Sequence, residues 1–193
     1  IYIWIKERPD YIITTGTIKI SGFSADINIT MLLLMLGGYV IQGAAEEFIS
    51  RGLVFHGLKG KVSLAVAVGA NALVFTFPHI GTLNDSEPQF VISGLINLVA
   101  ISCVFSFVTL RTKSIWAACG LHSVWNFCLS CILGLNLSGS EGDSNALIGM
   151  RNVGENLLNG GKYGIEASII TVAVAAAAAV LMWYSYKKGN KER

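Results

Sequence analysis

The feature that most constrains the fold of this chain is a series of long apolar runs separated by polar turns. The runs lie at residues 37–58, 62–80, 89–110, 114–135 and 166–186. Each approaches or exceeds the roughly 20 residues that an α-helix needs to cross about 30 Å of hydrocarbon. Only 13% of the residues are charged and the mean hydropathy is +0.59, whereas a soluble domain carries about a quarter charged residues. The sequence therefore predicts an all-α, polytopic transmembrane helix bundle of about five spans.

The polar regions beside the runs predict the domain organisation. We expect an N-terminal extramembrane segment at 1–26, a transmembrane domain at 27–186 and a basic C-terminal tail at 187–193. Residues 136–165 are rich in glycine and polar side chains, which predicts an exposed polar loop with a short helix near 147–158. The chain starts without methionine on an apolar, aromatic stretch, so we expect a fragment of a longer bundle.

The distribution of Lys and Arg residues predicts the orientation of the bundle. One set of alternating turns and ends carries Lys59, Lys61, Arg111, Lys113, Lys187, Lys188, Lys191 and Arg193. Cytoplasmic loops carry an excess of Lys and Arg, so we expect this side and the C-terminus to face the cytoplasm. The small size and the basic bias favour a bacterial plasma membrane. A net charge of only +2, without a basic stripe, argues against nucleic acid as a partner.

Polar side chains interrupt three of the apolar runs, and these are the candidate functional residues. They are Glu46, Glu47, Arg51, His79, His122 and Asn126. A charged side chain near the bilayer centre costs at least about 2.5–3.5 kcal/mol on insertion scales. Such residues therefore face the interior of a bundle and mark functional sites.

The spacing of the charged residues in the first run separates two roles. Glu47 and Arg51 are four residues apart, in the orientation that favours an ion pair on one helical face. Glu46 points about 100° away from Glu47 on a helix with 3.6 residues per turn. The carboxylate of Glu46 has no partner on its own helix, so we expect its partners to come from other spans.

The histidines are the candidate partners. His79 follows Pro78, which removes a backbone hydrogen bond and kinks the helix, and His122 and Asn126 share one face of the fourth run. Counting 1.5 Å per residue from the basic turns places Glu46, His79 and His122 within about 7 Å of a common depth of about 21 Å. The sequence therefore predicts one shared site inside the membrane.

These residues form three motifs that resemble a known family. The motifs are Glu46-Glu47-x-x-x-Arg51, Phe75-x-x-x-His79 and His122-x-x-x-Asn126. In this order and on separate spans they resemble the CAAX-processing and bacteriocin-processing/immunity (CPBP) family of intramembrane proteases. The resemblance covers residues 40–130, about half of the chain, and implies an endopeptidase that cleaves peptide bonds at or within the membrane. It makes residues 27–186 a catalytic domain.

The resemblance also implies a role for each motif residue. Glu46 and His79 would hold and deprotonate a water molecule, while His122 and Asn126 would donate hydrogen bonds to the developing oxyanion. The remaining motif residues would support the site, and they are Glu47, Arg51 and Phe75. The implied partners are a peptide or protein substrate at the membrane and the lipid bilayer itself. Preorganised donors in a dry cavity stabilise an oxyanion by several kcal/mol, so this chemistry is plausible on physical grounds.

Two alternatives remain at the level of sequence. Glu46, His79 and His122 could instead hold Zn²⁺ as a two-histidine, one-carboxylate set with an open position for water. We favour a glutamic mechanism without a metal or cofactor, because no H-E-x-x-H motif prescribes a zinc site. The second alternative is a non-hydrolytic membrane protein, either a bacteriocin-immunity scaffold or a proton-coupled carrier, that uses the same polar cluster.

Overall fold

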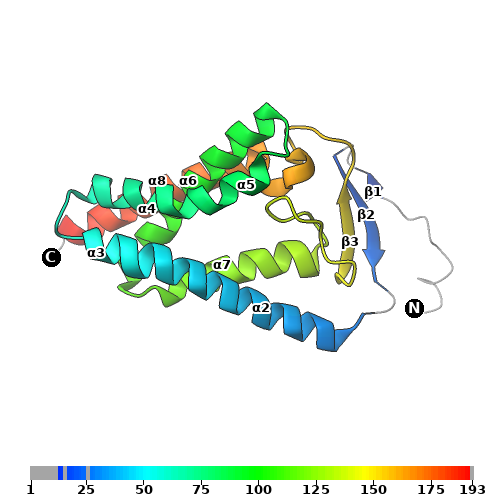
Figure 1. Cartoon of the computed structure of the whole chain (residues 1–193), viewed down its shortest axis with the longest axis horizontal. Helices are drawn as coiled ribbons and strands as arrows, with labels where there is room; N and C mark the ends of the chain where they lie inside the picture. The colour runs from blue at the N-terminus through cyan, green and yellow to red at the C-terminus, as the bar shows by residue number, and fades with distance from the viewer. Residues whose placement is uncertain (1–12, 15–16, 25–26, 192–193) are drawn as a thin grey trace.

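The helices of this protein form an elongated bundle with a small sheet at one end (Figure 1). The computed structural model describes residues 13–14, 17–24 and 27–191. The longer helices are α2 (Ile29–Glu47), α4 (Leu64–Thr76), α6 (Pro88–Thr112), α7 (Trp116–Phe127) and α8 (Ile169–Lys191). The short helical segments are η1 (Phe48–Phe55), α3 (His56–Leu58), η2 (Phe77–His79), α5 (Ile80–Leu83), η3 (Cys128–Ile132), η4 (Gly161–Tyr163) and η5 (Ile165–Ala167).

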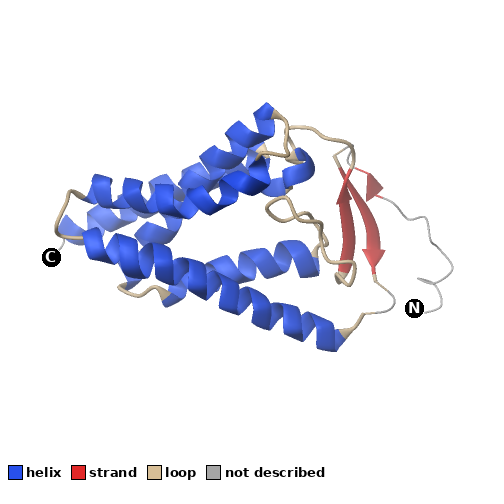
Figure 2. Cartoon of the chain, viewed as in Figure 1, coloured by secondary structure: helices blue, strands red, loops and turns tan. Residues whose placement is uncertain are grey.

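The helices pack in two groups. In one group α2 packs along α7, and in the other α6 packs against both α4 and α8. The segment η1 continues α2 and packs against α4, which joins the two groups. In Figure 1 the groups lie close together near the C-terminus and spread apart toward the sheet. Loop segments between α7 and α8 occupy the region where the helices spread (Figure 2).

The prediction of an all-α polytopic membrane bundle is confirmed. Among the described residues, four continuous helical segments are long and apolar enough to cross a membrane, namely Ile29–Leu58, Leu64–Leu83, Pro88–Thr112 and Ile169–Gly189. The fifth predicted span corresponds to α7 followed by η3, which together are shorter than these four. Large apolar side chains such as Leu34, Leu73 and Phe77 are exposed on the outer helix faces, as expected where lipid is the solvent.

A three-stranded antiparallel sheet was not predicted. Strands β1 (Ile13–Thr14), β2 (Ile18–Phe23) and β3 (Ile148–Asn152) pair in the order β1-β2-β3. The helix that the sequence predicted near 147–158 is therefore wrong, because this segment contributes β3. Its partner β2 is more than a hundred residues earlier in the chain, and pairing at that distance leaves no local signal in the loop.

Two helix ends also differ from the prediction. The first span begins at Ile29 rather than at residue 37, because Asn28 caps it by accepting a hydrogen bond from the backbone nitrogen of Met31 at 3.1 Å. The last helix continues through Lys191, so residues 187–191 of the basic C-terminal segment are helical. Most of the predicted segment 1–26 lies outside the described residues, and the domain boundaries stay a prediction.

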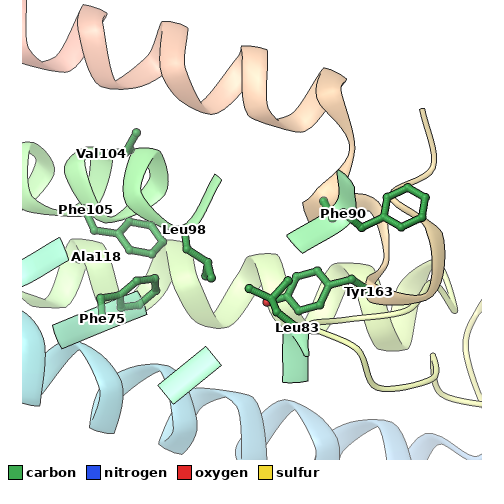
Figure 3. Close-up of a cluster of buried hydrophobic side chains, with 9 residues drawn as sticks. Phe75, Leu83, Phe90, Leu98, Val104, Phe105, Ala118 and Tyr163 are labelled. Atoms are coloured by element: carbon green, nitrogen blue, oxygen red, sulfur yellow. The ribbon is translucent and has the colours of Figure 1, made fainter. Parts of the chain in front are cut away.

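The main core cluster lies between the helices and includes one motif residue (Figure 3). It contains Phe75, Leu83, Phe90, Leu98, Val104, Phe105, Ala118, Tyr163 and Ala167. Residues Tyr163 and Ala167 come from the loop before α8. The second half of the polar loop is therefore anchored in the bundle, contrary to the prediction of an exposed loop.

Candidate active site

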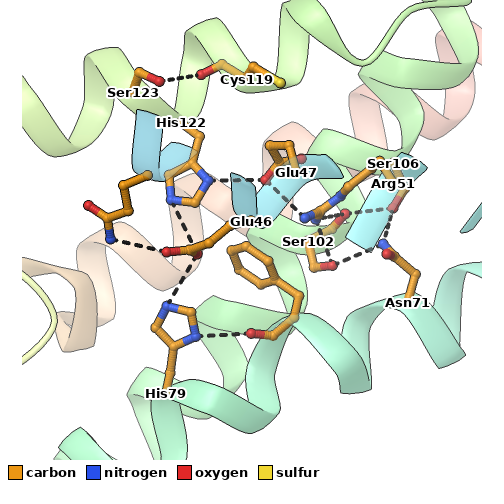
Figure 4. Close-up of polar contacts among 12 residues, drawn as sticks. Glu46, Glu47, Arg51, Asn71, His79, Ser102, Ser106, Cys119, His122 and Ser123 are labelled. Carbon is orange, nitrogen blue, oxygen red and sulfur yellow. Dashed lines mark hydrogen bonds and ion pairs between the residues drawn. The ribbon is translucent and has the colours of Figure 1, made fainter. Parts of the chain in front are cut away.

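Three helical segments bring Glu46, Glu47, His79 and His122 to one place (Figure 4). Glu46 and Glu47 are the last two residues of α2, His79 ends η2, and His122 lies in the middle of α7. Each motif lies at or just before a departure from regular α-helix: the wide η1 and η3 turns follow α2 and α7, and the tight η2 turn contains His79. Such local changes of helical geometry are frequent at functional sites.

A close approach of α2 and α7 positions the first and third motifs. Gly43 lies one turn before Glu47, and a Cβ atom added to it would lie 3.1 Å from the backbone nitrogen of Ser123. Small residues at helix interfaces allow backbones in membrane proteins to approach closely. Because Ser123 follows His122, this contact brings the imidazole of His122 to the two glutamates.

The carboxylate of Glu46 faces both imidazoles. Its Oε2 lies 4.0 Å from Nε2 of His79 and 3.8 Å from Nε2 of His122. Its Oε1 accepts a hydrogen bond from Nε2 of Gln42 at 3.0 Å. Gln42 also lies on α2, so the prediction that Glu46 has no partner on its own helix is wrong. The side chain of Glu46 is 30% exposed and that of His79 is 17% exposed, so these two groups are open to a ligand.

Hydrogen bonds at the other ring nitrogens fix both histidines. Nδ1 of His79 lies 2.9 Å from the carbonyl oxygen of Phe75, and Nδ1 of His122 lies 3.0 Å from Oε1 of Glu47. Both partners are acceptors, so the proton of a neutral ring is assigned to Nδ1 in each case. Each neutral imidazole therefore presents an unprotonated Nε2 toward Glu46.

Glu47 and Arg51 form the predicted ion pair, and both side chains are fully buried. Nη1 of Arg51 donates to Oε1 of Glu47 at 3.0 Å, and this same oxygen contacts His122. Nη2 of Arg51 donates to the carbonyl oxygen and the hydroxyl of Ser102 at 3.0 and 2.8 Å. Glu47 thus positions a candidate catalytic imidazole as well as pairing with Arg51.

The sequence analysis did not predict the serines that complete this hydrogen-bond network. Ser102 and Ser106 are one turn apart on α6, and both hydroxyls lie in reach of the side-chain amide nitrogen of Asn71. Ser106 also donates to the carbonyl oxygen of Ser102 at 2.8 Å. A pair of serines at helical spacing in an apolar run is the only sequence signal for them, and serines are common in transmembrane helices.

The ring of Phe75 separates the ion pair from the open side of the site. The guanidinium carbon of Arg51 lies 4.5 Å from the ring centroid of Phe75, within the range of a cation–π contact. The same ring packs edge-on against His122 at a centroid distance of 5.8 Å. Phe75 therefore supports both Arg51 and His122 by packing.

Unlike the side chains of Glu46, Glu47, Arg51, His79 and His122, the side chain of Asn126 has no hydrogen bond or ion pair within the described residues. Its side chain is buried on α7, one turn beyond His122. It makes no hydrogen bond to any residue in the described part of the chain, so no hydrogen bond joins it to Glu46 or His79. Its predicted role in oxyanion binding stays a prediction.

A pocket of about 330 Å³ adjoins the cluster. The first helical span contributes Glu46 of α2 and Ser50 of η1, and the second contributes His79 of η2 and Thr82 of α5. The loop after α7 contributes two serines, Ser138 and Ser140. The loop therefore forms one wall of the pocket, which the sequence did not indicate. A concave pocket with convergent polar groups is the usual setting of a binding or catalytic site.

The candidate metal ligands lie farther apart than neighbouring ligands of a tetrahedral zinc site. Ligand bonds of about 2.0–2.2 Å in a tetrahedral site place neighbouring donor atoms about 3.3–3.6 Å apart. The carboxylate oxygen of Glu46 lies 4.0 and 3.8 Å from the two Nε2 atoms, a more open arrangement. Within the described ranges, no group of three or more His, Cys, Asp or Glu side chains has the arrangement of a metal site.

The helices and the site define an integral membrane protein with a glutamate and two histidines beside a pocket. The family described as type II CAAX prenyl endopeptidase Rce1-like matches residues 28–128, a segment that includes all three motifs. The chain therefore belongs to this family of peptidases, and the resemblance predicted from the motifs is confirmed. No curated protein and no solved structure matches the chain.

Proposed function

We propose that this protein is an intramembrane endopeptidase in which Glu46 activates a water molecule against a peptide bond of a membrane-associated substrate. The observation that carries the proposal is the position of Oε2 of Glu46, 4.0 and 3.8 Å from Nε2 of His79 and His122 beside a pocket. A water about 2.8 Å from two of these atoms fits that spacing. Family membership supports the peptidase class.

In the first step Glu46 takes a proton from the bound water. The Nε2 lone pair of His79 accepts the second water proton as a hydrogen bond, which orients the oxygen toward the substrate. The oxygen adds to the carbonyl carbon of the peptide, and the former carbonyl oxygen becomes an oxyanion. General base catalysis of this kind contributes about 10²–10⁴-fold to the rate.

In the second step the tetrahedral intermediate collapses. The C–N bond breaks, and the proton held by Glu46 is transferred to the leaving amine. His122 and Asn126 stabilise the oxyanion in this proposal, and His122 donates from Nε2 only when both of its ring nitrogens are protonated. The positively charged ring then lies beside the carboxylate of Glu47, whose Oε1 is 3.0 Å from Nδ1.

The assignment of Glu46 and His79 is tested by peptide cleavage. The purified protein is given a synthetic peptide ending in a prenylated CAAX motif, and beside it a library of unprenylated peptides. We expect Glu46→Gln and His79→Ala to lower kcat/KM by about 100-fold or more. His56→Ala is the matched control, because His56 is exposed on α3 and belongs to no motif.

Cleavage that is equal in wild type and both variants would contradict these roles. If wild type cleaves no peptide, the endopeptidase proposal is wrong. The same cluster would then belong to a non-hydrolytic membrane protein, either an immunity scaffold or a carrier.

We propose that no metal takes part, and Zn²⁺ at Glu46, His79 and His122 is the alternative mechanism. In that case Zn²⁺ would acidify a bound water and polarise the carbonyl group. We expect activity to persist after dialysis against a strong chelator. Activity that the chelator abolishes and Zn²⁺ restores would replace the glutamic mechanism by a metal-dependent one.

A further inference from the structure

The tip of the loop after α7 is a tight turn that lies against the site. Leu137 and Ser140 exchange two backbone hydrogen bonds of 2.9 Å, and the two residues between them both have positive φ angles, 48° at Ser138 and 86° at Gly139. This is the pattern of a two-residue type I′ turn. The two backbone hydrogen bonds hold the four residues of the turn in this conformation.

The turn contacts the helix that carries His79. A Cβ atom added to Gly139 would lie 3.2 Å from the carbonyl oxygen of Thr82, and the hydroxyl of Thr82 donates to the carbonyl oxygen of His79 at 3.0 Å. Ser138 and Ser140 line the same pocket as Glu46 and His79. A second pocket, of about 100 Å³, is lined by Gly139 and Ser140. The turn therefore contributes to the walls of both pockets.

One carboxylate holds the turn in place. Oε2 of Glu166 accepts hydrogen bonds from the backbone nitrogen and the hydroxyl of Ser138 at 2.8 and 2.7 Å. Oε1 of Glu166 accepts from Nε1 of Trp125 at 3.1 Å. Trp125 precedes Asn126 on α7, so Glu166 links this helix to the turn and, through Thr82, to the segment of His79.

The backbone N–H donors of the turn are hydrogen-bonded within the described protein, whereas some of its acceptor groups are not. All four of its backbone N–H groups are bonded, to Ser140, Glu166, Tyr163 and Leu137 in chain order. Among the residues that the structure describes, neither the hydroxyl of Ser140 nor the carbonyl oxygens of Ser138 and Gly139 have a hydrogen-bond partner. These groups are suited to the N–H groups of an extended peptide.

We propose that the Leu137–Ser140 turn is the substrate-contacting wall of the site, and that Glu166 is the positioning residue that holds it. The turn binds the backbone of the substrate peptide beside Glu46 and His79. This inference deepens the proposed endopeptidase function and rests on it for the nature of the ligand. It assigns a role to a loop that lies outside the three motifs.

Peptide contact is tested by protection of an engineered thiol. Ser140→Cys is labelled with a maleimide in the purified protein, with and without an excess of the best-cleaved peptide, or of the prenylated CAAX peptide if none is cleaved. We expect the peptide to slow labelling by about tenfold, which corresponds to a mostly occupied site. The controls are wild type, whose four free cysteines are buried or half-buried, and Glu87→Cys, at the exposed start of α6.

The labelling experiment tests the peptide contact, and the cleavage experiment tests the endopeptidase function, so the two proposals can fail independently. Protection of Ser140→Cys without cleavage by wild type would retain the contact and refute the endopeptidase function. Cleavage without protection would refute the contact and retain the endopeptidase function. Equal slowing at Glu87→Cys would also refute the contact, because the effect would not be local.

The role of Glu166 is tested by steady-state kinetics. We expect Glu166→Gln to raise KM by about tenfold with a smaller change in kcat, because the turn loses charge-assisted hydrogen bonds and binds peptide less well. Glu155→Gln is the matched control, since Glu155 lies exposed in the same loop. A KM for Glu166→Gln equal to that of the control refutes the positioning role. A fall in thermal stability with unchanged KM also refutes it.

Discussion

At the scale of single residues, two adjacent glutamates differ in role because they differ in surroundings. Glu47 is fully buried and shares one oxygen between Arg51 and His122. Glu46 is 30% exposed, and its Oε2 faces two imidazoles beside the pocket. The side-chain chemistry is the same, so the difference comes from the helical face on which each carboxylate lies.

The buried pair has a testable effect on stability. Glu47→Ala leaves the guanidinium of Arg51 buried without its anion, and we expect it to lower the free energy of unfolding by about 3–5 kcal/mol. Glu46→Gln is the matched control and should change that energy by about 1 kcal/mol or less. Reversible unfolding in mixed detergent micelles measures both variants. Equal stability of the two variants would show that the Glu47–Arg51 pair does not stabilise the bundle.

At the scale of helices, the site depends on how closely α2 and α7 pack. The contact at Gly43 brings the backbones of the two helices together next to both glutamates and His122. On the opposite side of the site, Pro78 lies in the η2 turn that presents His79. A small residue in one motif-bearing helix and a proline in the other therefore set the geometry.

A side chain at Gly43 should separate the two helices. Gly43→Leu would clash with the backbone of Ser123, and we expect a loss of about 1–3 kcal/mol of stability together with most peptidase activity. Gly38→Leu on the same helix is the matched control, since a Cβ atom there meets nothing within 4 Å. Thermal unfolding in detergent and peptide cleavage are measured for both variants. A Gly43→Leu protein as stable and active as Gly38→Leu would contradict this packing.

At the scale of the whole molecule, the basic turns and the sheet lie at opposite ends of the bundle. Lys61 is part of the turn between α3 and α4. In Figure 1 this turn lies near the C-terminus and the strands lie at the far end. The pocket is lined in part by the loop that leads to the sheet. If the basic end faces the cytoplasm, as the sequence predicts, the loop wall of the pocket lies toward the opposite face of the membrane.

This orientation is tested by labelling in intact bacterial cells with a maleimide that does not cross membranes. We expect Glu87→Cys to be labelled in intact cells and Lys61→Cys only after lysis, because both residues are exposed but lie at opposite ends of the bundle. Wild type measures the background of the four native cysteines. The reverse pattern would invert the predicted topology.

Much of the candidate site could be predicted from the sequence, because its residues lie in motifs on apolar helices. The spacing of Glu47 and Arg51 predicted their ion pair, which the structure contains. Ser102 and Ser138 could not be predicted, because each meets its partner across a long separation in the chain. The helix predicted near 147–158 was wrong for the same reason, since β3 forms only by pairing with β2.

The sequence by itself determined that this chain forms apolar helices and belongs in a membrane, because hydropathy and helical spacing are local properties of neighbouring residues. It also determined which polar side chains need partners, because burying a charge in lipid is costly wherever the helix lies. Only the tertiary structure decided that Glu46 faces both imidazoles, that Glu47 positions His122, and that a loop turn borders the pocket. These contacts depend on how distant segments pack, and no local pattern specifies that packing.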